Sequence, residues 1–337
     1  MEAAISPVQI SPLNRGHLSS LLRLLRQSLP QEPITDTSFT RKVVLDPNFD
    51  ASGALVAHDD AGEVLGFLLA LTRRRPLEDG PDDTDRGWIT LFAVADTARR
   101  QGTGTALFDR AEAWLWERGC ATVSISPYAP NYWTPGVDEA AYPEALAFLQ
   151  QRGYTTVSRP LSMDASLTGG WSVPDWGKER RAELSRQGIE VVKFYSRNAL
   201  PLTDFLRREF PGDWQRYLRE TMLDIVAGRR PPDELTLAWG VADRRPPGEL
   251  TPAWERSTLI GFAQSEGERF GPFGVADAVR GRGVGAALLF HTLEGMQARG
   301  HHNAWFLWTD DKTADRLYRG AGFRETRRYA VMRKMLV

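Results

Sequence analysis

Two short glycine-containing segments in this chain have the spacing of an anion-binding turn. Residues 99–104 and residues 280–285 both follow the pattern Arg-x-x-Gly-x-Gly. Glycine has no Cβ, so successive backbone N–H groups can converge there, and a following helix adds free N–H groups and the positive end of its dipole. Such a turn is suited to binding a pyrophosphate group.

The two segments belong to a longer internal repeat. When the chain is shifted by 181 positions, residues 94–107 and 275–288 are identical at eight of fourteen positions. The pair Arg118-Gly119 falls on Arg299-Gly300 at the same shift, which gives the helix after each turn an equal length. A lone Gly-x-Gly is weak evidence, but two copies in the same context argue against coincidence.

The elements that position these turns follow from hydrophobic periodicity and from Gly and Pro punctuation. In the first half we expect strands at 54–58, 63–72, 88–94 and 121–125, helices at 102–118 and 142–151, and closing strands across 154–167. In the second half we expect strands at 189–195, 235–242, 258–264, 269–275 and 304–309, helical segments at 201–227, 283–299 and 313–320, and strands to the C-terminus. Each half is therefore an α+β domain with a mixed, mostly antiparallel sheet flanked by helices.

The stretch between the halves sets the expected domain boundaries. Residues 168–176 resemble a loop, and residues 175–186 have the charge density and the capping Asp of a solvated connecting helix. We expect one domain over 1–167, a linker over 168–186 and a second domain over 187–337.

The composition excludes several classes of protein. Forty-two Lys and Arg residues against 43 Asp and Glu residues give a net charge of −1, which disfavours binding to nucleic acid or to an anionic membrane. The single cysteine, Cys120, excludes an internal disulfide framework and is expected to be a buried thiol. His301 and His302 have no third ligand in the sequence pattern, so no metal site is expected. No secretory signal or membrane span is predicted, and the expected location is the cytoplasm.

The glycine spacing also argues against a dinucleotide-binding fold. That fold needs Gly-x-Gly-x-x-Gly early in a parallel βαβ unit. In the segment Gly281-x-Gly283-x-Gly285, no glycine stands three residues after Gly283, where that pattern requires one. The turn also follows three strands that are expected to be antiparallel.

With these residues the chain resembles the GNAT (Gcn5-related) N-acetyltransferase superfamily. The family's cofactor signature is a strand ending in Val, followed by Arg or Gln-x-x-Gly-x-Gly or Ala, and Val94 and Val275 each stand five residues before the arginine. The resemblance covers nearly the whole chain as a tandem pair. It implies acetyl-CoA as co-substrate, with the acetyl group passing directly to a primary amine of a small molecule or peptide. The residues implied to bind the cofactor are Val94, Arg99, Arg100, Gln101, Gly102, Thr103, Gly104 and Thr105 in the first half, and Val275, Arg280, Gly281, Arg282, Gly283, Val284, Gly285 and Ala286 in the second.

The same resemblance implies two catalytic residues in the second half. Tyr318, in a segment that ends Leu-Tyr-x-x-Ala-Gly-Phe, stands where the family places a tyrosine near the thioester sulfur, and Leu149 takes that position in the first half. Glu268 and its neighbour Glu266 are the carboxylates nearest to where the family often places its base. We expect Tyr318 and Glu268 to be catalytic.

Two alternatives remain open at this point. The N-terminal half could be catalytic and the C-terminal half structural, or the protein could bind or sense acyl-CoA without turnover. The aromatic insertion around Tyr128, Tyr132 and Trp133 either shapes an acceptor pocket or fills a disused one. The acceptor, the acyl chain length, the general base and the choice between a monomer (a pseudo-dimer) and a homodimer are left open.

Overall fold

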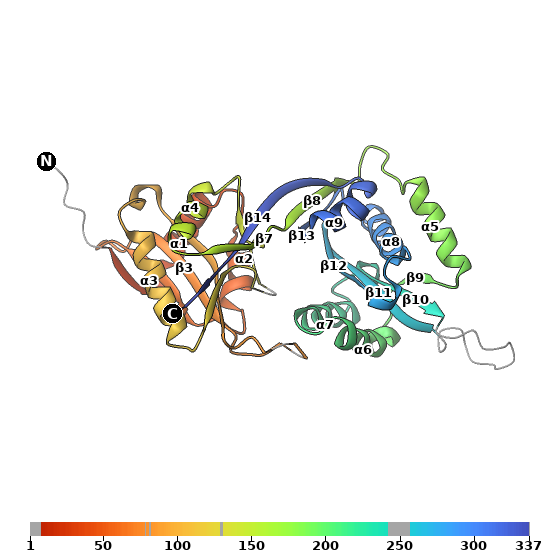
Figure 1. Cartoon of the computed structure of the whole chain (residues 1–337), viewed down its shortest axis with the longest axis horizontal. Coiled ribbons are helices and arrows are strands. Elements are labelled where there is room, and N and C mark those ends of the chain that lie inside the picture. The colour runs from red at the N-terminus through yellow and green to blue at the C-terminus, as the bar shows by residue number, and fades with distance from the viewer. Residues whose placement is uncertain (1–7, 78, 81, 129–130, 242–256, 337) are drawn as a thin grey trace. The chain divides into compact units, whose positions relative to one another are not determined.

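The computed structural model describes residues 8–77, 79–80, 82–128, 131–241 and 257–336 (Figure 1). The chain forms two compact units. Unit 1 comprises Met1–Pro76, Asp82–Pro160 and Arg328–Val337, and unit 2 comprises Leu77–Pro81 and Leu161–Arg327.

Unit 1 is a twisted sheet with helices on both faces. Its strands are β1 (Gln9–Pro12), β2 (Ala54–His58), β3 (Val64–Thr72), β4 (Arg86–Val94), β5 (Thr122–Ile125), β6 (Val137–Asp138) and β7 (Thr155–Ser158), and the C-terminal part of β14 (Arg324–Met335) pairs with β5. Its α-helices are α1 (Leu18–Ser28), α2 (Asp36–Phe39), α3 (Thr103–Trp116) and α4 (Pro143–Gln151). All pairs from β1 to β4 are antiparallel, whereas β4 and β5 run parallel.

Period-two alternation along the strands of unit 1 builds two separate hydrophobic cores. On β3, Phe67 and Leu69 pack with α1 and α2, whereas Leu68 and Ala70 pack with α3 and α4. A strand buried on both faces is expected to be apolar throughout, and residues 64–71 have this composition.

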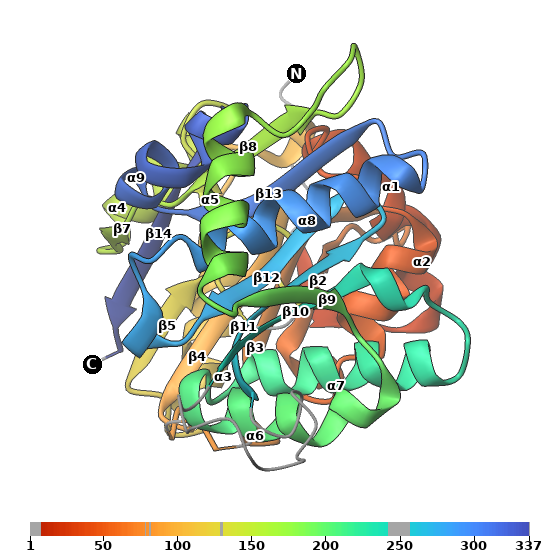
Figure 2. The same cartoon turned by 90° about the vertical axis from the view of Figure 1, so that its right-hand side faces the viewer.

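Unit 2 repeats the architecture of unit 1. Its strands are β9 (Glu190–Lys193), β10 (Leu235–Val241), β11 (Ser257–Glu266), β12 (Arg269–Val275), β13 (Asn303–Thr309) and β8 (Leu161–Ser166). Helices α6 (Ala199–Glu209) and α7 (Asp213–Val226) cover one face, and α5 (Asp175–Arg186), α8 (Val284–Ala298) and α9 (Asp311–Thr313) cover the other, where Figure 2 shows α5 crossing α8. Again a single parallel pair, β12 and β13, interrupts the antiparallel pairs of the described strands. The expected α+β class with a mixed, mostly antiparallel sheet is confirmed.

Each unit contains one strand from the other half of the sequence, and the expected domain boundaries at 167 and 187 do not allow for this exchange. Strand β8 lies in the first half of the sequence but pairs with β13 of unit 2. The last residues of the chain pair with β5 of unit 1. The compact units therefore do not follow the sequence order of the two halves.

The exchange predicts that substitutions destabilise the unit opposite to their place in the sequence. Met332 and Met163 are both fully buried, in the cores of unit 1 and unit 2 respectively. Replacing a buried Met by Ala costs about 2–5 kcal/mol. Met332→Ala should speed hydrogen exchange of the β5 amides, and Met163→Ala should speed that of the β13 amides. Faster hydrogen exchange in unit 2 for Met332→Ala, or in unit 1 for Met163→Ala, would contradict this assignment of the strands.

Helix α5 is part of unit 2 and not a solvated connector. Its bounds match the expected helix over 175–186, but Leu184 is buried in the core of unit 2, and Trp176 packs edge-on against Phe290 of α8 at 4.9 Å between ring centroids. Polar side chains on the outer face hid this apolar stripe in the sequence.

The N-terminal elements β1, α1 and α2 were not predicted. They extend the repeat, because α1 begins 181 positions before α6, and the buried Leu21, Leu24 and Leu25 stand 181 positions before the buried Leu202, Phe205 and Leu206.

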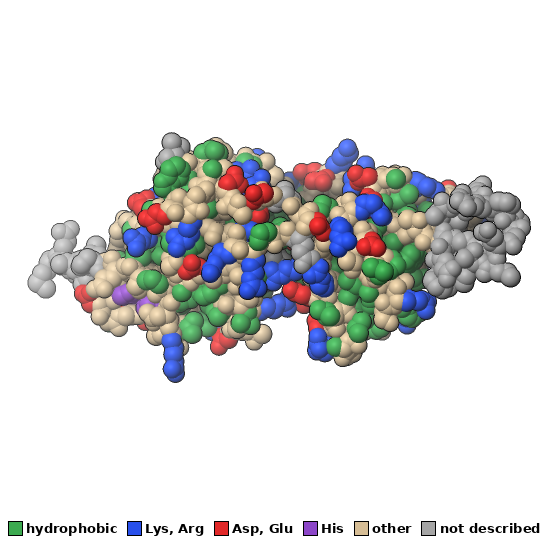
Figure 3. Space-filling view, turned by 90° about the horizontal axis from the view of Figure 1, so that it is seen from below, with side chains coloured by type: hydrophobic (Ala, Val, Ile, Leu, Met, Phe, Trp, Pro, Cys, Tyr) green, Lys and Arg blue, Asp and Glu red, His purple; other side chains and the backbone are tan. Residues whose placement is uncertain are grey.

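In the part of the chain that the structure describes, no helix is long and apolar enough to span a membrane. Figure 3 shows acidic and basic side chains together on the face that it draws.

Candidate acyl-CoA site

The two glycine turns have the same backbone conformation. Gly102 (φ 83°) and Gly283 (φ 92°) are left-handed and immediately precede α3 and α8. Arg100 (φ 59°) and Gly281 (φ 80°) are also left-handed and occupy equivalent positions, so the first turn holds a non-glycine residue where it is unfavourable. Neither helix has a side-chain cap, which leaves the N–H groups of its first turn available to an anion.

The arginine of each turn braces it from within. Nε of Arg99 donates to the carbonyl of Val94 at 3.2 Å, and Nε of Arg280 donates to the carbonyl of Val275 at 3.4 Å. Each guanidinium also pairs with an aspartate three residues earlier, Asp96 or Asp277. These contacts fasten each turn to the end of the preceding strand and so explain why the arginine accompanies the glycines.

The parallel strands separate beside each turn. In unit 1, pairing of β4 with β5 ends at Ile89, although β4 continues to Val94. In unit 2, only Arg269 and Trp305 are paired, although both strands continue to Val275 and Thr309. In each unit, one edge of the strand before the turn is therefore without a strand partner next to an uncapped helix N-terminus, while its other edge stays paired with β3 or β11.

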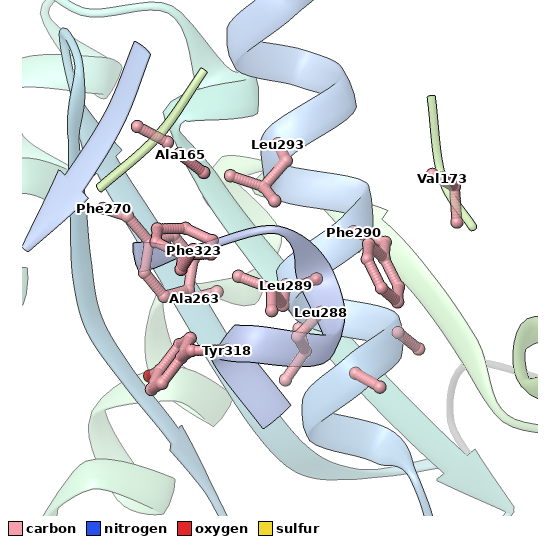
Figure 4. Packing of buried hydrophobic residues seen from close by; sticks show 14 of the residues in the cluster. Ala165, Val173, Ala263, Phe270, Leu288, Leu289, Phe290, Leu293, Tyr318 and Phe323 are labelled. Carbon is pink, nitrogen blue, oxygen red and sulfur yellow. The ribbon is translucent and has the colours of Figure 1, made fainter. Parts of the chain in front are cut away.

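Tyr318 lies where these two features of unit 2 meet. Its ring packs on Phe306 of β13 (4.4 Å between centroids) and on Phe270 and Phe273 of β12 (6.5 Å each). Only 5% of the residue is exposed, and Figure 4 shows its hydroxyl directed away from Leu288 and Leu289 of the core. That hydroxyl makes no hydrogen bond with the described residues. Burial, reinforced by the carboxylate of Asp310, raises the pKa of Tyr318 well above its usual range, so the phenol keeps its proton.

Unit 1 has no tyrosine at the position equivalent to Tyr318. Leu149 takes the position of Tyr318 and is fully buried. The hydroxyls of Tyr128, Tyr142 and Tyr154 all contact a carboxylate, from Asp46, Glu32 and Glu112 respectively.

Glu268 fastens a loop of unit 2 through hydrogen bonds to backbone N–H groups. Its Oε1 accepts the backbone N–H groups of His302 and Asn303 at 3.0 and 3.1 Å. It precedes β12, at the end opposite the glycine turn. The carboxylate therefore holds the loop before β13, and the expectation that it acts as the base has no support in this geometry. Glu266 accepts the hydroxyl of Tyr217 at 2.6 Å.

Tyr128 and Trp133 of the aromatic insertion are packed into a core of unit 1. Tyr128 is fully buried against Trp88, and its hydroxyl donates to Asp46 at 2.9 Å and accepts from Asn48 at 2.6 Å. Arg73, which forms a buried ion pair with Asp83 at 3.0 Å, stacks on both rings at 4.9 Å. This packing of Tyr128 favours the hypothesis that the insertion fills a disused pocket over the hypothesis that it shapes an acceptor pocket.

This network predicts a loss of stability without a loss of chemistry. Tyr128→Phe removes one hydrogen-bond partner from each of the buried side chains of Asp46 and Asn48, which costs about 1–3 kcal/mol. Urea unfolding should report this loss, while the acetyl transfer that the sequence resemblance implies keeps a rate near that of the wild type in the folded protein. A selective fall in kcat with unchanged stability would instead place Tyr128 in a catalytic site.

Asp310 and Cys120 both have structural positions. Asp310 accepts the N–H of Thr313 at 2.7 Å and so caps the start of α9. Cys120 is buried, which confirms the expected buried thiol, and this burial raises its pKa to about 11. Among the described residues, no cluster of three His, Cys, Asp or Glu side chains could hold a metal ion.

The family model for the acetyltransferase (GNAT) family matches residues 19–134 and 200–323, which together make up most of the chain. The chain belongs to the GNAT acetyltransferase family. Both matches include a glycine turn, so it is a tandem two-domain GNAT protein.

Solved structures have the same fold over nearly the whole length. A GNAT protein from Sphaerobacter thermophilus is 20% identical, with a TM-score of 0.70 and coverage of 98% of this chain and 97% of that one. A tandem GNAT protein from the clavulanic acid biosynthesis pathway is 15% identical, with a TM-score of 0.61 and coverage of 98% and 99%. The glucosamine N-acetyltransferase region of a fungal multi-domain GH3 β-N-acetylglucosaminidase is 18% identical, with a TM-score of 0.74. This chain is covered to 98% in that match but spans only 38% of the fungal protein.

Proposed function

We propose that this protein is an acetyl-CoA-dependent N-acetyltransferase whose unit 2 transfers the acetyl group directly to a primary amine. The observation that supports this assignment most is the Tyr318 hydroxyl, which is protonated, nearly buried and free of hydrogen bonds in the described structure, beside the β12–β13 opening. Unit 1 has Leu149 at that position.

The residues of the unit 2 turn would hold the cofactor. The N–H groups at the start of α8, from Gly283 to Ala286, face the place expected for the pyrophosphate. The edge of β12 that faces β13 and is not paired with it beyond Arg269 would accompany the pantetheine arm toward Tyr318. When bound, acetyl-CoA supplies the acyl thioester that is to be transferred.

The reaction requires one proton to leave and one to arrive. The neutral amine attacks the thioester carbonyl, the new C–N bond forms, and the C–S bond breaks with the electron pair on sulfur. We propose that Tyr318 donates its proton to this sulfur. The proton that the amine releases passes to water, and a proton from water restores the Tyr318 hydroxyl.

Incubation with labelled acetyl-CoA and a panel of primary amines tests the proposal. The panel should contain an amino sugar, because one structural neighbour is described as a glucosamine N-acetyltransferase, together with polyamines, aminoglycosides and peptide amines. We expect label in at least one amine product. Tight binding of acetyl-CoA without transfer to any member would instead favour an acyl-CoA-sensing protein.

A further inference from the structure

Helix α5 lies against the glycine turn of unit 2. Besides the contact between Trp176 and Phe290, Nε1 of Trp176 donates to the carbonyl of Gly320 at 3.2 Å, and Arg181 pairs with Glu294 of α8. The helix is thus fixed to α8 and to the segment that follows Tyr318 (Figure 2).

One side chain of α5, Arg180, covers the left-handed glycine of that turn. A Cβ placed on Gly283 would lie 2.3 Å from Cδ, 2.8 Å from Cγ and 2.9 Å from Nε of Arg180. The stem of the arginine therefore occupies the space that a side chain at residue 283 would need. At the end of the helix, Gln187 accepts from Arg282 of the same turn at 3.2 Å.

The guanidinium of Arg180 is held only weakly in this position. It donates to Glu183 at 2.8 Å, three residues along the same helix, and both side chains are more than two-fifths exposed. Exposed ion pairs of this kind contribute little to stability and exchange readily for a stronger anionic partner.

The turn of unit 1 lacks this cover. Nothing lies within 4 Å of the Cβ position of Gly102, although its backbone conformation matches that of Gly283. The contact with Arg180 therefore distinguishes two turns that are otherwise equivalent. Because Arg180 lies outside the glycine motif, the motif alone does not predict this contact.

We infer that Arg180 is a phosphate-binding residue of the unit 2 site, contributed by α5 from outside the glycine motif. The inference rests on the proposed function, in which this turn holds the pyrophosphate of a CoA thioester. Arginine presents several N–H donors in a planar fork that suits phosphate oxygens. From its place over Gly283, the guanidinium exchanges Glu183 for the phosphates, while Arg280 keeps its bracing contacts within the turn.

Calorimetry with CoA on Arg180→Ala tests this role. The full-length Gly102→Asp protein serves as background, so that only the unit 2 site is counted. Loss of a charged hydrogen bond predicts affinity for CoA weakened by about 10- to 100-fold. Arg186→Ala, an exposed arginine of the same helix, should change the affinity by less than about twofold, and Arg180→Lys should lie between Arg180→Ala and the background protein.

A second substrate distinguishes phosphate binding from a packing role. Acetylpantetheine is a thioester without the nucleotide phosphates, and its kcat/KM for acetyl transfer should be the same in Arg180→Ala and in the background protein. A parallel loss with acetylpantetheine would assign Arg180 to packing of α5 and overturn the inference. Equal or tighter CoA binding by Arg180→Ala would also overturn it, while leaving the proposed function intact. No CoA binding by the background protein would overturn both.

Discussion

Tyr318→Phe should lower kcat for acetyl transfer by about 10²- to 10⁴-fold, the usual contribution of general acid–base catalysis. The substitution keeps the ring, which packs on Phe306 and Phe270, and removes only the hydroxyl. Affinity for acetyl-CoA should hardly change, because the glycine turn is untouched. The hydroxyl donates to no described group, so we expect the free energy of unfolding to change by less than about 1 kcal/mol. Steady-state kinetics and urea unfolding measure the two quantities separately.

Leu149→Ala is the matched control in the first half. Leu149 is fully buried at the position equivalent to Tyr318, so the substitution should cost about 2–5 kcal/mol of stability. It should not cause a comparable selective loss in kcat. If Tyr318→Phe retained near-full turnover, the assignment to unit 2 would fail, and Tyr128, Tyr132 and Tyr142 of unit 1 would become the residues to test.

Gly283→Asp should remove CoA binding by unit 2, with an affinity loss of about 100-fold or more. The new carboxylate would stand in the pyrophosphate site, where two like charges 4 Å apart repel by about 4 kcal/mol at an effective dielectric constant of 20. The left-handed φ of 92° and the stem of Arg180 add strain to any side chain there. Calorimetry on the full-length protein counts the sites before and after the change.

Gly102→Asp makes the same substitution in unit 1. Both turns retain the arginine, the two glycines and the same geometry, so we expect two CoA sites in the wild-type protein, with the unit 2 site the tighter. Each variant should lose one site, and Gly283→Asp should lose the tighter. Unchanged stoichiometry and affinity after Gly283→Asp would remove unit 2 from the account of cofactor binding.

The sequence predicts correctly the bounds of those helices and strands whose apolar residues recur with a clear local period. Strand β2 has the expected bounds, 54–58, and the expected helices after both turns begin within one residue of the observed ones. These segments combine a clear apolar repeat with glycine at the boundary. The segment expected as one helix over 313–320 is less regular, since α9 is followed by π-helical and 3₁₀ turns before Gly322.

The strand exchange could not be predicted, because the competing strands have interchangeable patterns. Leu161 and Met163 of β8 correspond, 169 positions later, to Ala330 and Met332 of β14, and all four residues are buried. Either strand could pair with either partner on local grounds, and only tertiary packing selects one. The role of Glu268 was also beyond the sequence, since a carboxylate that caps a loop and one that accepts a proton look alike there.

A structure determined with acetyl-CoA bound tests most directly whether unit 2 is the catalytic unit. We expect the cofactor in the β12–β13 opening, with its pyrophosphate on the N–H groups after Gly283 and its sulfur within hydrogen-bonding reach of the Tyr318 hydroxyl. Acetyl-CoA bound in unit 1 alone, or a sulfur remote from Tyr318, would contradict it.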